Sequence, residues 1–77
     1  MYYLFLLVNN INMKILLQKV MYEKNVSIRQ LANLTGISKS TINNIMAERY
    51  SPTLENLEKI AKSLKVKMSD LYESPYK

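Results

Sequence analysis

Residues 27–47, SIRQLANLTGISKSTINNIMA, decide the fold that the sequence predicts. The stretch is typical of two short helices joined by a tight turn, with a serine able to cap each helix, at Ser27 and at Ser38. Gly36 interrupts the helical pattern just past the first helix, where a left-handed backbone is wanted and glycine adopts it at little cost. We therefore predict a helix over residues 28–35, a turn at Gly36 and a second helix after Ser38.

Each predicted helix has an apolar face and a polar face. The apolar face recurs at helical spacing and is expected to point inward; it consists of Ile28, Leu31, Ala32, Ile37, Thr41, Ile42 and Ile45. The opposite face of the second helix carries short and amide side chains with one lysine, namely Lys39, Ser40, Asn43 and Asn44. This polar face has no carboxylate and no large apolar group, so it is the surface that tells most about function.

The run LANLTGISKSTINNI resembles the helix-turn-helix of Cro/repressor-type (lambda-repressor-like) DNA-binding domains. The shared features are an alanine in the first helix, a glycine at the turn and an apolar residue directly after it. The resemblance continues through YSPTLENLEKIAKSLKV, which is similar to the family's fourth helix and its lead-in, and covers roughly residues 13–71. It implies an all-α, five-helix lambda-repressor-like helix-turn-helix domain, to which the N-terminus could add a short β-strand.

The flanking helices follow from local signals. The first is expected from about residue 12 or 13 to Lys24, with Asn25 at its end because asparagine tolerates the left-handed conformation. Its inward residues are Leu16, Leu17, Val20 and Met21. The fourth helix is capped by Thr53 and has an apolar stripe of Leu54, Leu57, Ile60, Ala61 and Leu64. Ser69 is expected to cap a last short helix over residues 70–73, with Val66, Met68 and Leu71 closing the core.

Four positions depart from the family pattern. Many members pair an arginine in the first helix with a glutamate late in the recognition helix, and the matching positions here are Met21 and Met46, whose side chains are expected to pack together. Leu34 replaces a usually polar residue and is either an interface residue or a tolerated surface leucine. Glu48 stands near a position where the family often has glycine, which leaves the form of that turn open.

Composition agrees with nucleic-acid binding. The 77 residues include Lys+Arg 11 against Asp+Glu 6, a net charge of +5 and a pI of about 9.6, the sign expected of a nucleic-acid binder, although solubility alone is also compatible with it. The clustered Lys59, Lys62, Lys65 and Lys67 are interpreted as a solvated face rather than as a second DNA contact.

The sequence offers no support for catalysis. The absence of cysteine and histidine excludes disulfides, a zinc finger and His-based catalysis, and is compatible with a reducing cytoplasm, where we expect the protein to act. There is no Gly-rich phosphate loop, metal-ligand cluster or nucleophile–base pair. We therefore expect no enzyme activity, no cofactor, no metal and no small-molecule ligand.

The N-terminal run MYYLFLLV, residues 1–8, is apolar on both alternating faces. It is too short to span a bilayer and lacks the basic start and cleavage site of a signal peptide, so no membrane association is expected. One interpretation is a strand that pairs with the same strand of a second subunit; the other is that translation begins at Met13. The predicted organisation is an extension over 1–11, a DNA-binding domain over 12–73 and a frayed C-terminus over 74–77.

The resemblance implies a transcriptional regulator of the repressor kind that binds double-stranded DNA, with the helix over 38–47 in the major groove. Because one recognition helix covers only a few base pairs, we also predict a homodimer held largely by the N-terminal segment. By the family's matching positions, base edges would be met by Lys39, Ser40 and Asn44, with Asn43 and Ser38 able to contact either bases or phosphates. The predicted backbone contacts are Ser27, Arg29, Ser38, Arg49, Tyr50 and Ser51. The alternatives are a merely solvated helix face and a protein-interaction module, such as an antitoxin-like partner, which binds another protein through its N-terminal strand.

Overall fold

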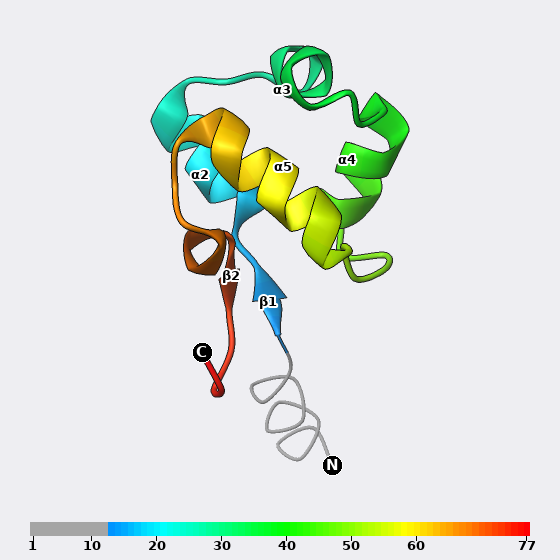
Figure 1. Cartoon of the computed structure of the whole chain (residues 1–77). Helices are drawn as coiled ribbons and strands as arrows, with labels where there is room; N and C mark the ends of the chain where they lie inside the picture. The colour runs from blue at the N-terminus through cyan, green and yellow to red at the C-terminus, as the bar shows by residue number, and fades with distance from the viewer. Residues whose placement is uncertain (1–12) are drawn as a thin grey trace.

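The computed structural model describes residues 13–77, and within them the chain forms four α-helices and one small antiparallel sheet. The helix α5 crosses the middle of the molecule, with α2, α3 and α4 arranged around it (Figure 1). In chain order the elements are β1 (Lys14–Ile15), α2 (Leu17–Lys24), α3 (Ile28–Thr35), α4 (Lys39–Met46), α5 (Leu54–Leu64), the 3-10 turn η1 (Met68–Leu71) and β2 (Tyr72–Glu73). The expected all-α, five-helix domain is therefore confirmed only as a mostly helical one, with four α-helices in this part of the chain and a small sheet.

The turn between α3 and α4 is built as the sequence predicts. Ser27 caps α3 in a reciprocal capping box, in which its Oγ accepts from the Gln30 N–H at 3.1 Å and its own N–H donates to Gln30 Oε1 at 2.9 Å. Gly36 ends α3 with φ +77°, in the left-handed region. Asn25 ends α2 in the same conformation, with φ 61°. Local capping chemistry is thus enough to set the ends of these helices.

The first helix is shorter than expected because the residues before it form a strand. Lys14 pairs with Glu73 and Ile15 with Tyr72 in the antiparallel sheet, so α2 begins only at Leu17. A further bond, from the Leu16 N–H to the Leu71 carbonyl at 2.8 Å, continues this link. Both ends of the described chain therefore lie side by side, as β1 and β2 do in Figure 1, and this pairing takes the place of the first turn of the expected helix.

The last expected helix, over residues 70–73, is wrong in position and type. A single 3-10 turn runs over Met68–Leu71, and the chain then becomes extended in β2. The Asp70 Oδ2 accepts from the Lys67 N–H at 3.0 Å, so the aspartate stabilises the start of the turn in place of the expected Ser69 cap. Sheet pairing of Tyr72 and Glu73 prevents the helical continuation.

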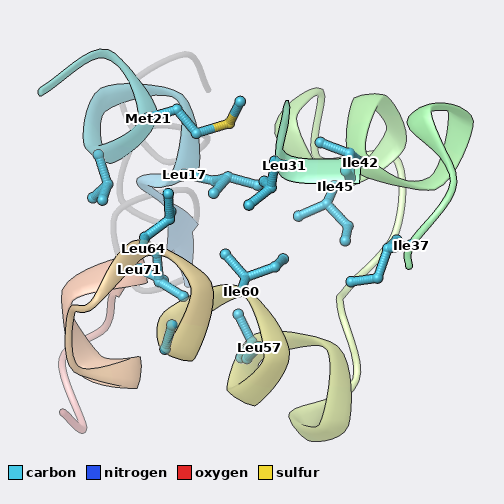
Figure 2. Packing of buried hydrophobic residues seen from close by; sticks show 12 residues of the cluster. Leu17, Met21, Leu31, Ile37, Ile42, Ile45, Leu57, Ile60, Leu64 and Leu71 are labelled. Atoms are coloured by element: carbon cyan, nitrogen blue, oxygen red, sulfur yellow. The ribbon is translucent and has the colours of Figure 1, made fainter. Parts of the chain in front are cut away.

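The core lies between α5 and the other three helices (Figure 2). Leu31, Ile42, Ile45 and Ile60 are completely buried, each at 0 % exposure. The remaining buried apolar residues are Leu17, Val20, Met21, Ile37, Leu57, Ala61, Leu64 and Leu71. Leu54 is an exception to the predicted stripe, since it is 76 % exposed in the first turn of α5, where the helix projects beyond the core.

The substituted pair of methionines lies in or against this core. Met21 is buried, and Met46 is partly buried and packs against the cluster. Two apolar side chains thus occupy a region where an ion pair would have needed costly desolvation. Leu34 is 61 % exposed and lies on the surface of α3.

The predicted N-terminal strand within residues 1–8 lies outside the described residues. Over residues 13–77, no helix has both the length and the apolar character needed to cross a membrane.

Candidate nucleic-acid interface

The outward face of α4 carries the four predicted base-contacting residues. Lys39, Ser40 and Asn43 are exposed and Asn44 is half-buried, whereas Ile42 and Ile45 on the same helix are fully buried. The helix is thus anchored by its apolar side and presents hydrogen-bonding side chains on the other. Such a surface can offer donors and acceptors to base edges.

Two of the predicted backbone-contacting residues already serve as helix caps. The Ser38 Oγ accepts from the Thr41 N–H at 3.1 Å and donates to Thr41 Oγ1 at 2.9 Å at the start of α4. Ser27 is similarly engaged in the capping box of α3. The Ser27 hydroxyl can still donate to a phosphate oxygen while it caps α3, whereas the Ser38 hydroxyl must give up its bond to Thr41 Oγ1 before it can donate to DNA.

The loop after α4 folds back over the end of the helix. The Glu48 N–H donates to the Ile45 carbonyl at 3.0 Å and the Arg49 N–H to the Asn44 carbonyl at 3.0 Å, the bond pattern of a Schellman motif. Glu48 takes the left-handed position, with φ 57°, where glycine is usual. The sequence did not determine the form of this turn. The structure shows that Glu48 adopts the left-handed turn that the family usually makes with glycine.

This turn brings two of the predicted site residues into direct contact. Arg49 Nη1 donates to Asn44 Oδ1 at 2.9 Å, although the sequence assigned the two residues to different roles. Sequence reasoning missed this pair, because the residues are five apart and meet only when the backbone reverses at Glu48. The sequence did offer one signal, since the family often has a glycine near Glu48, which indicates a left-handed turn there.

A shallow groove next to this pair adds a residue that the sequence analysis did not select. Gln18, an exposed residue of α2, lines it together with Asn43, Met46, Ala47 and Arg49. An amide side chain there can hydrogen-bond to phosphates or bases. The other predicted backbone-contacting residues, Arg29 at the start of α3 and Tyr50 and Ser51 in the loop after α4, are exposed; no hydrogen bond joins their side chains to this groove within residues 13–77.

The charge distribution favours an anionic partner on this side of the molecule. No aspartate or glutamate occurs in residues 24–47, which include all of α3 and α4. Three of the carboxylates are paired elsewhere, in Lys19–Glu23 at 3.0 Å, Glu55–Lys59 at 3.6 Å and Glu73–Lys77 at 3.4 Å. Among the described residues, no group of acidic side chains is arranged to hold a metal ion.

An amphipathic helix joined by a glycine turn to a supporting helix, with a polar outer face and flanking basic residues, is the architecture of a helix-turn-helix DNA-binding domain. A comparison with family models bears this out, because residues 16–75 match the Cro/C1-type HTH DNA-binding domain. The match covers most of the chain, and the protein belongs to this family. A comparison with curated proteins gives no match.

Proposed function

We propose that the protein is a sequence-specific transcriptional repressor that reads the major groove of double-stranded DNA with α4. Membership of the Cro/C1-type family supports DNA binding. The observation that carries the finer proposal is the outward face of α4, where four polar side chains free of carboxylates stand opposite fully buried isoleucines. A surface helix of this form fits the width of the major groove.

In this proposal the base contacts are made by α4. Lys39 donates to guanine O6 and N7, and Asn44 pairs with adenine N6 and N7. Ser40 is a permissive contact because its hydroxyl both donates and accepts. Asn43, exposed beside the groove next to Arg49, contacts an adjacent base.

Residues on either side of α4 hold the domain on the phosphate backbone. Arg29 at the start of α3 and Arg49 after α4 supply positive charge, and the hydroxyl and main-chain donors come from Ser27, Ser38, Tyr50 and Ser51. Such contacts set the register of α4 in the groove and carry no base information themselves. The protein acts in the cytoplasm, as a homodimer joined through its N-terminal segment and neighbouring surface.

Selection from a pool of random duplexes tests the proposal. The full chain should retain a roughly palindromic sequence, and a reporter gene that carries this sequence in its promoter should be repressed. Lys39→Ala should change the selected sequence, whereas Lys62→Ala, an exposed lysine of α5, should not. A protein that binds no duplex even at low ionic strength would contradict the proposal and favour the protein-interaction module. Reporter activation would contradict the repressor role alone.

A further inference from the structure

Arg49 contacts Asn44 through both its main chain and its side chain. The Arg49 N–H donates to the Asn44 carbonyl at 3.0 Å, and Arg49 Nη1 donates to Asn44 Oδ1 at 2.9 Å. The left-handed Glu48 makes this double contact possible, because it reverses the chain directly after α4. The main-chain bond fixes the Arg49 backbone next to the end of α4, which brings its guanidinium within reach of the Asn44 side chain.

The contact determines which way the Asn44 amide faces. A guanidinium has donors only, so it can bond the oxygen of an amide and not its NH₂ group. With Oδ1 bonded to Arg49, a flip of the amide would place two donors against each other and lose the bond. The Nδ2 donors are thus kept on the other branch of the amide, and Oδ1 keeps a second lone pair for another donor.

Arg49 has further donors available beyond this bond. Within residues 13–77 its side chain forms none of the ion pairs, which join Lys19–Glu23, Glu55–Lys59 and Glu73–Lys77. Since a guanidinium has five N–H donors, one can hold Asn44 while others meet a phosphate oxygen. One side chain can then link the backbone contact to the base contact.

We propose that Arg49 is a positioning residue that holds the Asn44 amide in its base-reading orientation, and so contributes to sequence specificity without touching a base. This inference rests on the proposed DNA-binding function. It differs from a simple phosphate contact in one measurable way. Loss of a phosphate contact weakens all duplexes alike, whereas loss of the positioning bond also reduces the preference between two bases at the position that Asn44 reads.

A double-mutant cycle on paired duplexes tests the inference. The two duplexes differ only at the base pair whose preference Asn44→Ala relaxes, and the ratio of their dissociation constants is measured, so that a uniform loss of phosphate contact cancels. In the otherwise unchanged protein, Arg49→Ala should reduce this ratio by at least about threefold. In a protein that already carries Asn44→Ala, adding Arg49→Ala should change the ratio very little. Arg29→Ala, which removes an exposed arginine from α3, is the matched control and should leave the ratio unchanged.

A measurement on the free protein is independent of DNA. In the NMR spectrum of the ¹⁵N-labelled full chain, the order parameter of the Asn44 side-chain amide should fall in Arg49→Ala and stay unchanged in Arg29→Ala. Thermal unfolding of each variant checks that the domain remains folded.

The outcomes separate the inference from the function on which it rests. If Asn44→Ala relaxes a base preference and Arg49→Ala does not, or if the Asn44 amide is equally ordered without Arg49, the inference is overturned and the proposed function stands. If Asn44→Ala relaxes no base preference, the assignment of Asn44 as a base contact fails, and with it the role inferred for Arg49. Absence of all duplex binding would overturn the proposed function itself.

Discussion

Individual residues in the left-handed conformation set the direction of the chain at each helix end. Gly36 does so after α3, and Asn25, Glu48 and Lys65 do so after α2, α4 and α5, with φ of 61°, 57° and 58°. For residues other than glycine and asparagine this conformation is strained. At Glu48 the reversal brings Arg49 into contact with Asn44.

Glu48→Gly should therefore stabilise the domain. Glycine adopts φ 57° without strain, and we expect the free energy of unfolding to rise by about 1 kcal/mol, less the entropy that glycine adds to the unfolded chain. Urea denaturation measures the change. Glu48→Ala removes the same carboxylate and keeps the strain, so it should give little gain. An equal gain in both variants would show that charge, and not backbone conformation, is responsible.

Gly36→Val should have the opposite effect. A Cβ built on Gly36 meets no atom within 4 Å, so the loss arises from the φ of +77° and not from a clash. A β-branched residue in this conformation is expected to cost on the order of 1–3 kcal/mol, which is large for a small domain. Thermal unfolding should show a clearly lower Tm. Gly36→Asn should lose less, because asparagine tolerates the left-handed region; equal losses would point to another cause.

Among the secondary-structure elements, the best predicted helices are those whose ends are set by residues close by in the sequence. The caps at Ser27, Ser38 and Thr53 each bond a main-chain N–H three residues later, and all three are present. The helical spacing of apolar residues likewise identified the buried faces of α3, α4 and α5, except at Leu54.

The errors occur where distant segments decide the outcome. Residues 14–15 have apolar neighbours compatible with a helix, and only their pairing with residues 72–73 makes them a strand. The same pairing makes residues 72–73 extended, so that a 3-10 turn over Met68–Leu71 replaces the helix expected over residues 70–73. The contact between Arg49 and Asn44 was missed for a local reason, because a glutamate stands at the left-handed position of the turn between them. For the candidate site, the exposed positions were predictable from the sequence, and the contacts among them were not.

The capping box of α3 provides a test at this scale. Ser27→Ala removes the acceptor of the Gln30 N–H and should lower the free energy of unfolding by about 1 kcal/mol. Ser27→Thr keeps a hydroxyl acceptor and should lose less. Ser40→Ala removes an exposed serine of α4 whose side chain caps nothing in the described part of the chain, and is expected to be nearly neutral. A comparable loss in Ser40→Ala would mean that the effect of Ser27 does not arise from the cap.

For the whole molecule, the net charge of +5 predicts salt-dependent binding to DNA. Each phosphate that is neutralised releases condensed counterions, so log K should fall with log salt by about 0.9 per contact. With Arg29 and Arg49 as the two cationic backbone contacts, we expect a slope of roughly −2 per protomer. Removing either arginine should reduce its magnitude by about 1, whereas Lys62→Ala on α5 should leave it unchanged. An equal effect of Lys62→Ala would indicate non-specific attraction by the whole surface.

Assembly gives the last prediction, because one recognition helix covers only a few base pairs. Useful specificity normally needs two copies on half-sites about one DNA turn apart. The run of residues 1–8 is apolar on both alternating faces, and pairing two such strands about a two-fold axis would cover their edges and create that symmetry together.

We therefore expect the full chain to be a dimer and a chain lacking residues 1–10 to be a monomer, as measured by sedimentation. The shortened chain keeps β1 and every helix described, so it should retain its thermal unfolding transition. Its affinity for a single half-site should be unchanged and its affinity for the palindrome reduced. A shortened protein that remains dimeric, or a full-length protein that is monomeric at high concentration, would exclude this role for the N-terminal segment.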